Sequence, residues 1–220
     1  MKQTLFVTND GSTSIHIEEW NESYHSKHGA IQEAYHVFIK NGLSLLQGKS
    51  VSILEIGFGT GLNALITLKE APNFDQIVDY VGVEAFPVAM EMAMQMNYVS
   101  QLDDESLQTS FQNLHEVECE IKHQISTSFS LTKEKKMFQE INHKNQFDLI
   151  YFDAFGFRVQ PELWSVEIFQ KMYDAMKSGG ILVTYACRSS IKNAMKEVGF
   201  TVEKLPGAPG KREMLRAIKN

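Results

Sequence analysis

The chain has 220 residues, of which 43% are hydrophobic and 22% are charged. This composition is ordinary for a globular protein of one domain, whose core needs no metal ion or disulfide to hold it together. The formal net charge of −6 excludes a protein that coats nucleic acid nonspecifically, because Lys and Arg contacts to phosphate dominate such binding. The sequence has no signal-peptide pattern and no apolar run near the ~20 residues that span a bilayer, so we expect a cytoplasmic protein. Cys119 and Cys187 lie far apart without C-x-x-C spacing and predict reduced thiols.

Residues 1–30 are polar and mixed, and we expect them to form an N-terminal extension before a single domain over residues 31–220. Alternation at Ile15–Ile17 is typical of a short strand. Apolar residues at helical spacing predict a helix over Ala30–Leu46, and the methionines of Val88–Met96 predict a second helix that fills part of the core.

Further along the chain, apolar runs alternate with helical patterns. Strands are expected at Val51–Ile56, Tyr80–Val83, within Phe129–Lys135, and at Phe147–Phe152, Ile181–Tyr185, Thr201–Leu205 and Met214–Ile218. Helices are expected at Leu62–Glu70, near Met137–Ile141, and at Trp164–Met176 and Ile191–Val198. This alternation predicts an α/β fold in which helices cover both faces of a mostly parallel sheet.

The last two predicted strands are joined by Pro206–Gly210, a loop rich in turn-forming residues. They therefore predict an antiparallel hairpin at the end of the sheet. A Rossmann-like sheet of seven strands that closes with such a hairpin is typical of class I methyltransferases, which use S-adenosylmethionine. Dinucleotide oxidoreductases usually lack this hairpin.

The strongest local motif is the segment Glu55–Asn63, which reads EIGFGTGLN and lies between a predicted strand and a predicted helix. Glycines there let the backbone approach a ligand, and the helix N-terminus points at it. The spacing E-x-G-x-G-x-G differs from the G-x-G-x-x-G of nicotinamide and flavin proteins, and it resembles the first motif of class I methyltransferases. A purely structural glycine turn is the alternative. The predicted cofactor-binding residues of this segment are Glu55, Gly57, Phe58, Gly59, Gly61 and Asn63.

Two acidic residues end predicted strands downstream. Glu84 follows the next strand after the glycine segment, where a carboxylate accepts hydrogen bonds from the ribose hydroxyls of a cofactor. Asp153 and Phe155 follow the strand at Phe147–Phe152, and we expect them in the crevice at the carboxyl ends of the strands. Asp153 is predicted to orient an attacking amine, and also to border the cofactor, while Phe155 packs beside the amine. A strand that merely ends in an acidic residue is the alternative for Glu84.

The sequence contains no motif of the other common catalytic classes. The seven histidines show no metal-ligand spacing, and neither a G-x-S-x-G elbow nor a P-loop is present. A polyamine synthase would carry a second acidic residue shortly after Asp153, but Gly156 and Phe157 stand there.

These residues together resemble the methyltransferase half of the MnmC family, the bifunctional enzymes that make 5-methylaminomethyl-2-thiouridine in tRNA. The resemblance runs through most of the chain. It is carried by Tyr24–Phe38, Gly57–Asn63, Phe152–Phe155, Pro161–Trp164, Gly179–Thr184, Val198–Phe200 and Gly210–Leu215.

The resemblance implies S-adenosylmethionine as cofactor and tRNA as partner. The reaction would be N-methylation of the 5-aminomethyl group on a wobble uridine or 2-thiouridine. Lys211 and Arg212 would then contact the phosphate backbone or the pocket rim, and Tyr24, Ser26 and Glu33 would help to cover the cofactor. A charged cluster that is simply solvated remains the alternative for the C-terminal basic residues.

The sequence also departs from the family pattern. The family's bifunctional members carry a flavin-dependent oxidoreductase domain, so a chain of this length is expected to act as a stand-alone methyltransferase without flavin or metal. Ala154 stands where the family has Gly, and only Glu134 is a candidate for contact with the adenine.

Two other functions are compatible with the same motifs. One is a class I methyltransferase that acts on a small-molecule or protein amine. The other is a catalytically silent protein of the same fold that serves as an interaction module.

Overall fold

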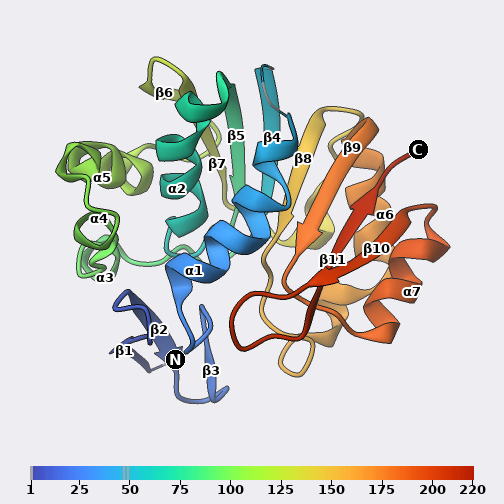
Figure 1. Ribbon diagram of the computed structural model, residues 1–220, viewed down its shortest axis with the longest axis horizontal. Helices are drawn as coiled ribbons and strands as arrows, with labels where there is room; N and C mark the ends of the chain where they lie inside the picture. The colour runs from blue at the N-terminus through green and yellow to red at the C-terminus, as the bar shows by residue number, and fades with distance from the viewer. Residues whose placement is uncertain (1, 47, 49) are drawn as a thin grey trace.

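The computed structural model describes residues 2–46, 48 and 50–220. Figure 1 shows a large sheet with helices on both faces and a small N-terminal sheet beside it. The small sheet has strand order β1-β2-β3, and the large sheet has order β10-β11-β9-β8-β4-β5-β7-β6. In the described part of the chain, no helix is long and apolar enough to cross a membrane.

Strands and helices alternate through most of the chain. The strands are β1 Gln3–Val7, β2 Thr13–Ile17, β3 Glu22–Ser23, β4 Ser50–Ile56, β5 Ile77–Val83, β6 Lys122–Ser126, β7 Phe129–Glu134, β8 Phe147–Phe152, β9 Met176–Thr184, β10 Thr201–Pro206 and β11 Glu213–Ile218. The α-helices are α1 Ala30–Ala34, α2 Leu62–Glu70, α3 Met90–Ala93, α4 Tyr98–Gln101, α5 Gln108–Glu116, α6 Val166–Ala175 and α7 Ser189–Glu197.

The large sheet separates two apolar layers because successive side chains of a strand point to opposite faces. In β4, Val51 and Ile53 pack with α1, α2, α4 and α5, whereas Leu54 and Ile56 pack with α6 and α7. Figure 1 shows α1 and α2 over one face of the sheet and α6 and α7 on the other side. Both faces are therefore buried, which explains the nearly continuous apolar runs of the central strands.

The predicted α/β class I fold with its closing hairpin is confirmed. β10 pairs with β11, and β11 pairs with β9, both in antiparallel register. The predicted count of seven strands is wrong, because the large sheet holds eight strands among the described residues. The additional strand β6 lies at the edge, antiparallel to β7. Its sequence KHQIS is mostly polar and partly exposed, so it carries no apolar pattern that marks a strand.

Several predicted helices are shorter or less regular than expected. The segment expected as one helix over Ala30–Leu46 comprises α1, a π-helix at Tyr35–Lys40 and a 3₁₀ turn at Leu43–Leu46. The methionine-rich segment is helical only in α3, and the helix expected near Met137–Ile141 is one 3₁₀ turn.

The small N-terminal sheet is attached to the large domain at two places. Asn97 accepts hydrogen bonds from the backbone N–H (2.8 Å) and hydroxyl (3.1 Å) of Thr13. Arg158, in the loop after β8, donates to the backbone carbonyls of Trp20 and Asn21 (both 3.0 Å). The N-terminal sheet is therefore held over the carboxyl ends of the central strands. The predicted division of the chain at residue 30 stays a prediction.

Candidate active site

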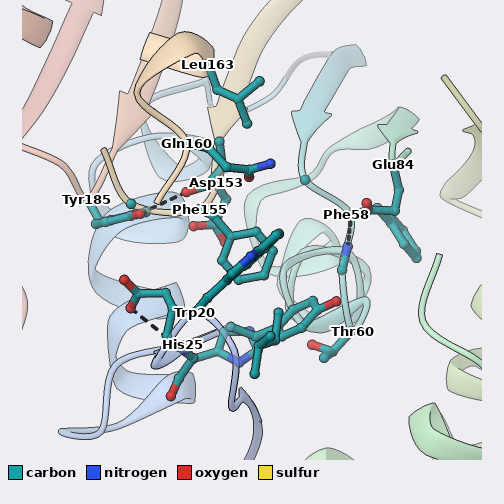
Figure 2. Close-up of a pocket in the computed structure, with 18 of the residues that line it drawn as sticks. Trp20, His25, Phe58, Thr60, Glu84, Asp153, Phe155, Gln160, Leu163 and Tyr185 are labelled. Atoms are coloured by element: carbon teal, nitrogen blue, oxygen red, sulfur yellow. Dashed lines mark hydrogen bonds between the residues drawn. The ribbon is translucent and has the colours of Figure 1, made fainter. Parts of the chain in front are cut away.

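The main cavity lies at the ends of β4 and its two neighbours, β5 and β8, where the order of the strands in the sheet reverses. All three strands are parallel, and such a switch point is where open α/β sheets bind ligands. The cavity measures about 910 Å³ and is bordered by the segment after β4, the ends of β5 and β8, and the N-terminal sheet. Figure 2 shows Glu84 and Tyr185 at opposite ends of this cavity, with Trp20 and Phe155 between them.

The glycine segment after β4 depends on glycine at two crowded positions. Gly57 has a φ of +89°, and a Cβ there would lie 2.6 Å from the backbone oxygen of Asp153. Gly59 has a φ of +50°, and its Cβ would lie 3.2 Å from the ring of Tyr24. A side chain at either position would push the loop away from β8 or from the N-terminal sheet. Both glycines line the cavity, as do Phe58 and Asn63, while Gly61 lies outside it.

Glu84 is held rigidly at the end of β5. The backbone N–H of Gly59 donates to one of its carboxylate oxygens (3.1 Å), and the N–H of Phe86 donates to the other (3.0 Å). Burial raises the pKa of Glu84, and these backbone hydrogen bonds act against the rise. The carboxylate lines the cavity and can accept hydrogen bonds from neighbouring hydroxyls of a ligand.

Glu55 lies beneath the loop and does not line the cavity. Its side chain is fully buried. It accepts hydrogen bonds from the hydroxyl of Tyr80 (2.8 Å) and the side-chain nitrogen of Asn63 (2.9 Å). Burial raises the pKa of Glu55 well above its usual value. Glu55 therefore holds the side chain of Asn63 in position.

Asn63 connects this buried carboxylate to the cavity. Its Nδ2 also donates to Oδ2 of Asp153 at 2.8 Å. Its Oδ1 is buried and has no hydrogen-bond partner among the described residues. A buried amide oxygen without a donor is costly, so this atom points to a ligand that donates a hydrogen bond to it.

Asp153 is the most strongly perturbed carboxyl group that faces the cavity. Burial, together with the nearby charge of Glu33, raises its pKa to about 7, while Asn63 and Lys211 act in the opposite direction. Lys211 forms an ion pair with Glu33, and its Nζ lies 3.8 Å from the ring centroid of Tyr185. The hydroxyl of Tyr185 donates to the backbone oxygen of Ala154 (2.8 Å).

Three aromatic side chains that line the same cavity as Asp153 pack together. Phe155 packs edge-on against Trp20 (centroids 5.4 Å apart) and Tyr24 (5.0 Å), as Figure 2 shows for Trp20 and Phe155. Sequence reasoning missed Trp20, because a single aromatic residue in a polar extension has no pattern that indicates a site. It also missed His25, which lines the cavity. Burial lowers the pKa of His25 to about 4, so this ring is neutral at physiological pH.

The remaining predicted residues lie at different places. Tyr24, Ser26, Glu33 and Lys211 line the main cavity, whereas Arg212 lines an adjoining hollow. Glu134 lies outside the cavity, where His143 (3.0 Å) and Lys136 (3.1 Å) pair with it. Among residues 2–46, 48 and 50–220, no group of three His, Cys, Asp or Glu side chains could hold a metal ion.

A family model of S-adenosyl-L-methionine-dependent methyltransferases matches residues 96–220. The chain belongs to this family. Its cofactor is therefore S-adenosylmethionine, and the observations above fit that molecule. The glycines let the backbone lie close to the cofactor. Glu84 offers acceptors for its hydroxyl groups, and Oδ1 of Asn63 offers an acceptor for its ammonium group.

Several relatives and solved structures of methyltransferases and related enzymes are similar to the chain. The tRNA 5-methylaminomethyl-2-thiouridine biosynthesis bifunctional protein MnmC of Delftia acidovorans is 30% identical over 90% of this chain and 32% of that protein. The protein of the same name from Marinomonas sp. is 27% identical over 90% of this chain and 31% of that protein. The chain thus spans about a third of the length of these relatives.

Solved structures share the fold of this methyltransferase. The crystal structure of MNMC2 from Aquifex aeolicus has a TM-score of 0.76 and 24% identity, over 99% of this chain and 70% of that one. Spermidine synthase in complex with a transition-state analogue has a TM-score of 0.63 and 15% identity, over 99% of this chain and 68% of that one. At these identities, the likeness shows the fold alone.

Proposed function

We propose that the protein transfers a methyl group from S-adenosylmethionine to the amine of 5-aminomethyluridine, or its 2-thio form, at the wobble position of tRNA. The relatives named for 5-methylaminomethyl-2-thiouridine biosynthesis support this substrate. The observation that carries the proposal is the position of Asp153. It lies in one cavity with the glycine loop, Glu84 and the aromatic rings of Phe155, Trp20 and Tyr24. Because tRNA is the substrate, we expect the protein to act in the cytoplasm.

The cofactor would lie along the ends of β4 and β5. Gly57 and Gly59 would let the backbone approach the cofactor. Gly61, with a φ of +74°, is the N-cap residue at which α2 begins. Glu84 would accept hydrogen bonds from its ribose hydroxyls, and Asn63 would accept one from its ammonium group. When bound, S-adenosylmethionine supplies the electrophilic methyl group.

Asp153 would hold the attacking nitrogen. An alkylamine has a solution pKa near ~10.4 and is mostly protonated at neutral pH, but only the neutral amine attacks. A carboxylate with a pKa of about 7 in the folded chain accepts a proton more readily than an ordinary aspartate does. Desolvation by Phe155, Trp20 and Tyr24 lowers the pKa of a buried amine. Orientation of the nitrogen toward the methyl group would supply most of the rate.

The test is transfer of labelled methyl from S-adenosylmethionine to tRNA. We expect label on tRNA that bears 5-aminomethyluridine and no label on the same tRNA without the aminomethyl group. The Asp153→Ala variant serves as the inactive control. Label on neither tRNA, with measurable cofactor binding, would contradict the tRNA substrate and leave another amine as the candidate.

A further inference from the structure

A second hollow adjoins the mouth of the active-site cavity. It measures about 500 Å³ and shares Gly156, Tyr185 and Lys211 with the main cavity. Its other lining residues come from the loop after β8, the start of α7 and the hairpin between β10 and β11. Three arginines border it: Arg158, Arg188 and Arg212. A group bound in this hollow would therefore lie next to a ligand that reaches Asp153.

The hollow has an excess of positive charge, although the whole chain has a net charge of −6. Arg188 and Arg212 are exposed, and neither has a carboxylate within ion-pair distance in the described part of the chain. The carboxylate of Glu213 borders the hollow, but Lys204 pairs with it at 2.9 Å. Arg158 is paired with Glu22 at 3.2 Å. Two guanidinium groups are thus left to bind an anion.

The geometry of Arg188 suits such binding. Its guanidinium lies 4.5 Å from the centroid of the Phe157 ring, and stacking on an aromatic face keeps the planar group in place. A guanidinium held this way presents N–H donors that match two phosphate oxygens at once. Arg188 thus offers an anion an ordered donor rather than a freely moving charge.

The N-terminus of α7 adds to the positive electrostatic potential at the hollow. The helix has nine residues, Arg188 is its N-cap, and no side chain caps its first N–H groups. Ile191 of its first turn lines the hollow. Free N–H groups and the helix dipole favour an anion at this end. The start of α7 and the two unpaired arginines therefore border the same hollow.

We propose that this hollow binds backbone phosphates of the RNA strand next to the nucleotide in the active site. The inference rests on the proposed function. A base that reaches Asp153 has to leave its stack and enter the cavity, and its neighbouring phosphates then remain at the mouth. The hollow adjoins the main cavity, because Tyr185 and Lys211 line both of them. Phosphate contacts of this kind set affinity and orientation without reading sequence.

The experiment compares Arg188→Glu and Arg212→Glu with a matched control, Lys122→Glu. Lys122 lies in β6 at the opposite edge of the sheet, and its pair with Asp79 is half exposed, so its replacement makes the same charge change away from the hollow. For the two arginine variants we expect the KM for tRNA to rise at least about tenfold. We also expect the slope of log affinity against log salt to fall by about one per lost contact. The affinity for S-adenosylmethionine and the kcat at saturating tRNA should stay unchanged.

A second readout separates this inference from the proposed function. Direct binding of a tRNA anticodon stem-loop is measured at several salt concentrations, without turnover. Binding of the stem-loop that depends on the arginines, without methyl transfer, would support phosphate binding in the hollow and contradict the proposed methyl-transfer reaction. Methyl transfer by the wild-type protein, with unchanged KM and salt slope in both arginine variants, would overturn the inference and leave the reaction intact. Arg188→Lys should recover only part of the lost affinity, because it keeps the charge but not the fork of donors.

Discussion

Asn63 donates one hydrogen bond from Nδ2 to Asp153, at 2.8 Å, and a second to the buried carboxylate of Glu55, at 2.9 Å. A single amide group thus links the end of β8 to the interior of β4. We expect Asn63→Ala to lower the free energy of unfolding by about 1–3 kcal/mol, because it leaves Glu55 short of a donor in the core. It should also lower kcat, since Asp153 loses the bond that orients it.

Chemical denaturation and steady-state kinetics measure the two effects of Asn63→Ala. The matched control is Asn73→Ala, which removes an exposed hydrogen bond to Glu70 and should change stability by no more than about 0.5 kcal/mol. Equal stability of the two variants would show that the link between Glu55 and Asp153 does not stabilise the fold.

Asp153→Ala should abolish methyl transfer while the affinity for S-adenosylmethionine stays within about tenfold of wild type. The reason is that Asp153 would act on the attacking amine, whereas Glu84 and the glycine loop would hold the cofactor. Calorimetric titration of the cofactor and single-turnover methyl transfer measure the two properties. A parallel loss of both would place Asp153 in the cofactor site instead.

The contribution of Asp153 to the stability of the ligand-free protein should fall as the pH rises from about 4 to about 7. Burial raises the pKa of Asp153 from 3.8 to about 7, so the folded state holds its proton more tightly than the unfolded state. The resulting stabilisation is complete below the unfolded pKa and is lost as the pH passes through the folded pKa. The raised pKa of Glu55 acts in the same direction, whereas the lowered pKa of His25 acts in the opposite direction. The contribution of Asp153 is therefore measured against a variant that cannot titrate there.

Urea denaturation at about pH 5 and about pH 8 tests this pH dependence. Asp153→Asn cannot titrate at this position, so the stability of wild type relative to this variant should be lower at about pH 8 than at about pH 5. If both proteins lose the same amount, Asp153 does not have a raised pKa in the folded chain.

Glu84→Gln should weaken S-adenosylmethionine binding by about 10- to 100-fold, because hydrogen bonds to a charged group contribute about 1.5–3 kcal/mol. Turnover at saturating cofactor should change much less. Glu91→Gln, at an exposed position of α3, is the control and should leave the affinity unchanged. A normal affinity in Glu84→Gln would exclude Glu84 from the cofactor site.

Gly57→Ala should damage cofactor binding far more than Gly179→Ala. Both glycines have positive φ, +89° and +77°, so both substitutions strain the backbone. Only at Gly57 would the new Cβ meet another atom, the backbone oxygen of Asp153 at 2.6 Å, whereas nothing lies within 4 Å at Gly179. Thermal melting with and without cofactor measures the difference. Similar ligand-induced shifts in the two variants would contradict the close approach of the loop to β8.

The central strands and the glycine motif were predictable because their patterns are local. β4 and β8 are apolar runs buried on both faces, and the segment Glu55–Asn63 combines a strand end, glycines and a helix start. The edge strand β6 and the irregular helix after Ala34 were not predictable. The sequence of β6 is mostly polar, and the apolar spacing after Ala34 predicts a helix without indicating its π-helical form.

The sequence by itself determined the class of the fold, the order of its central strands along the chain, and the acidic residues that end them. It did so because alternation, burial and turn chemistry act over a few neighbouring residues. Only the tertiary structure decided that Glu55 lies outside the cavity, that Trp20 packs against Phe155 in the cavity that holds Asp153, and that Arg188 lines the adjoining hollow. Each of these relationships joins residues that are distant in the chain, and it arises only when the sheet brings the strand ends together beneath the N-terminal strands.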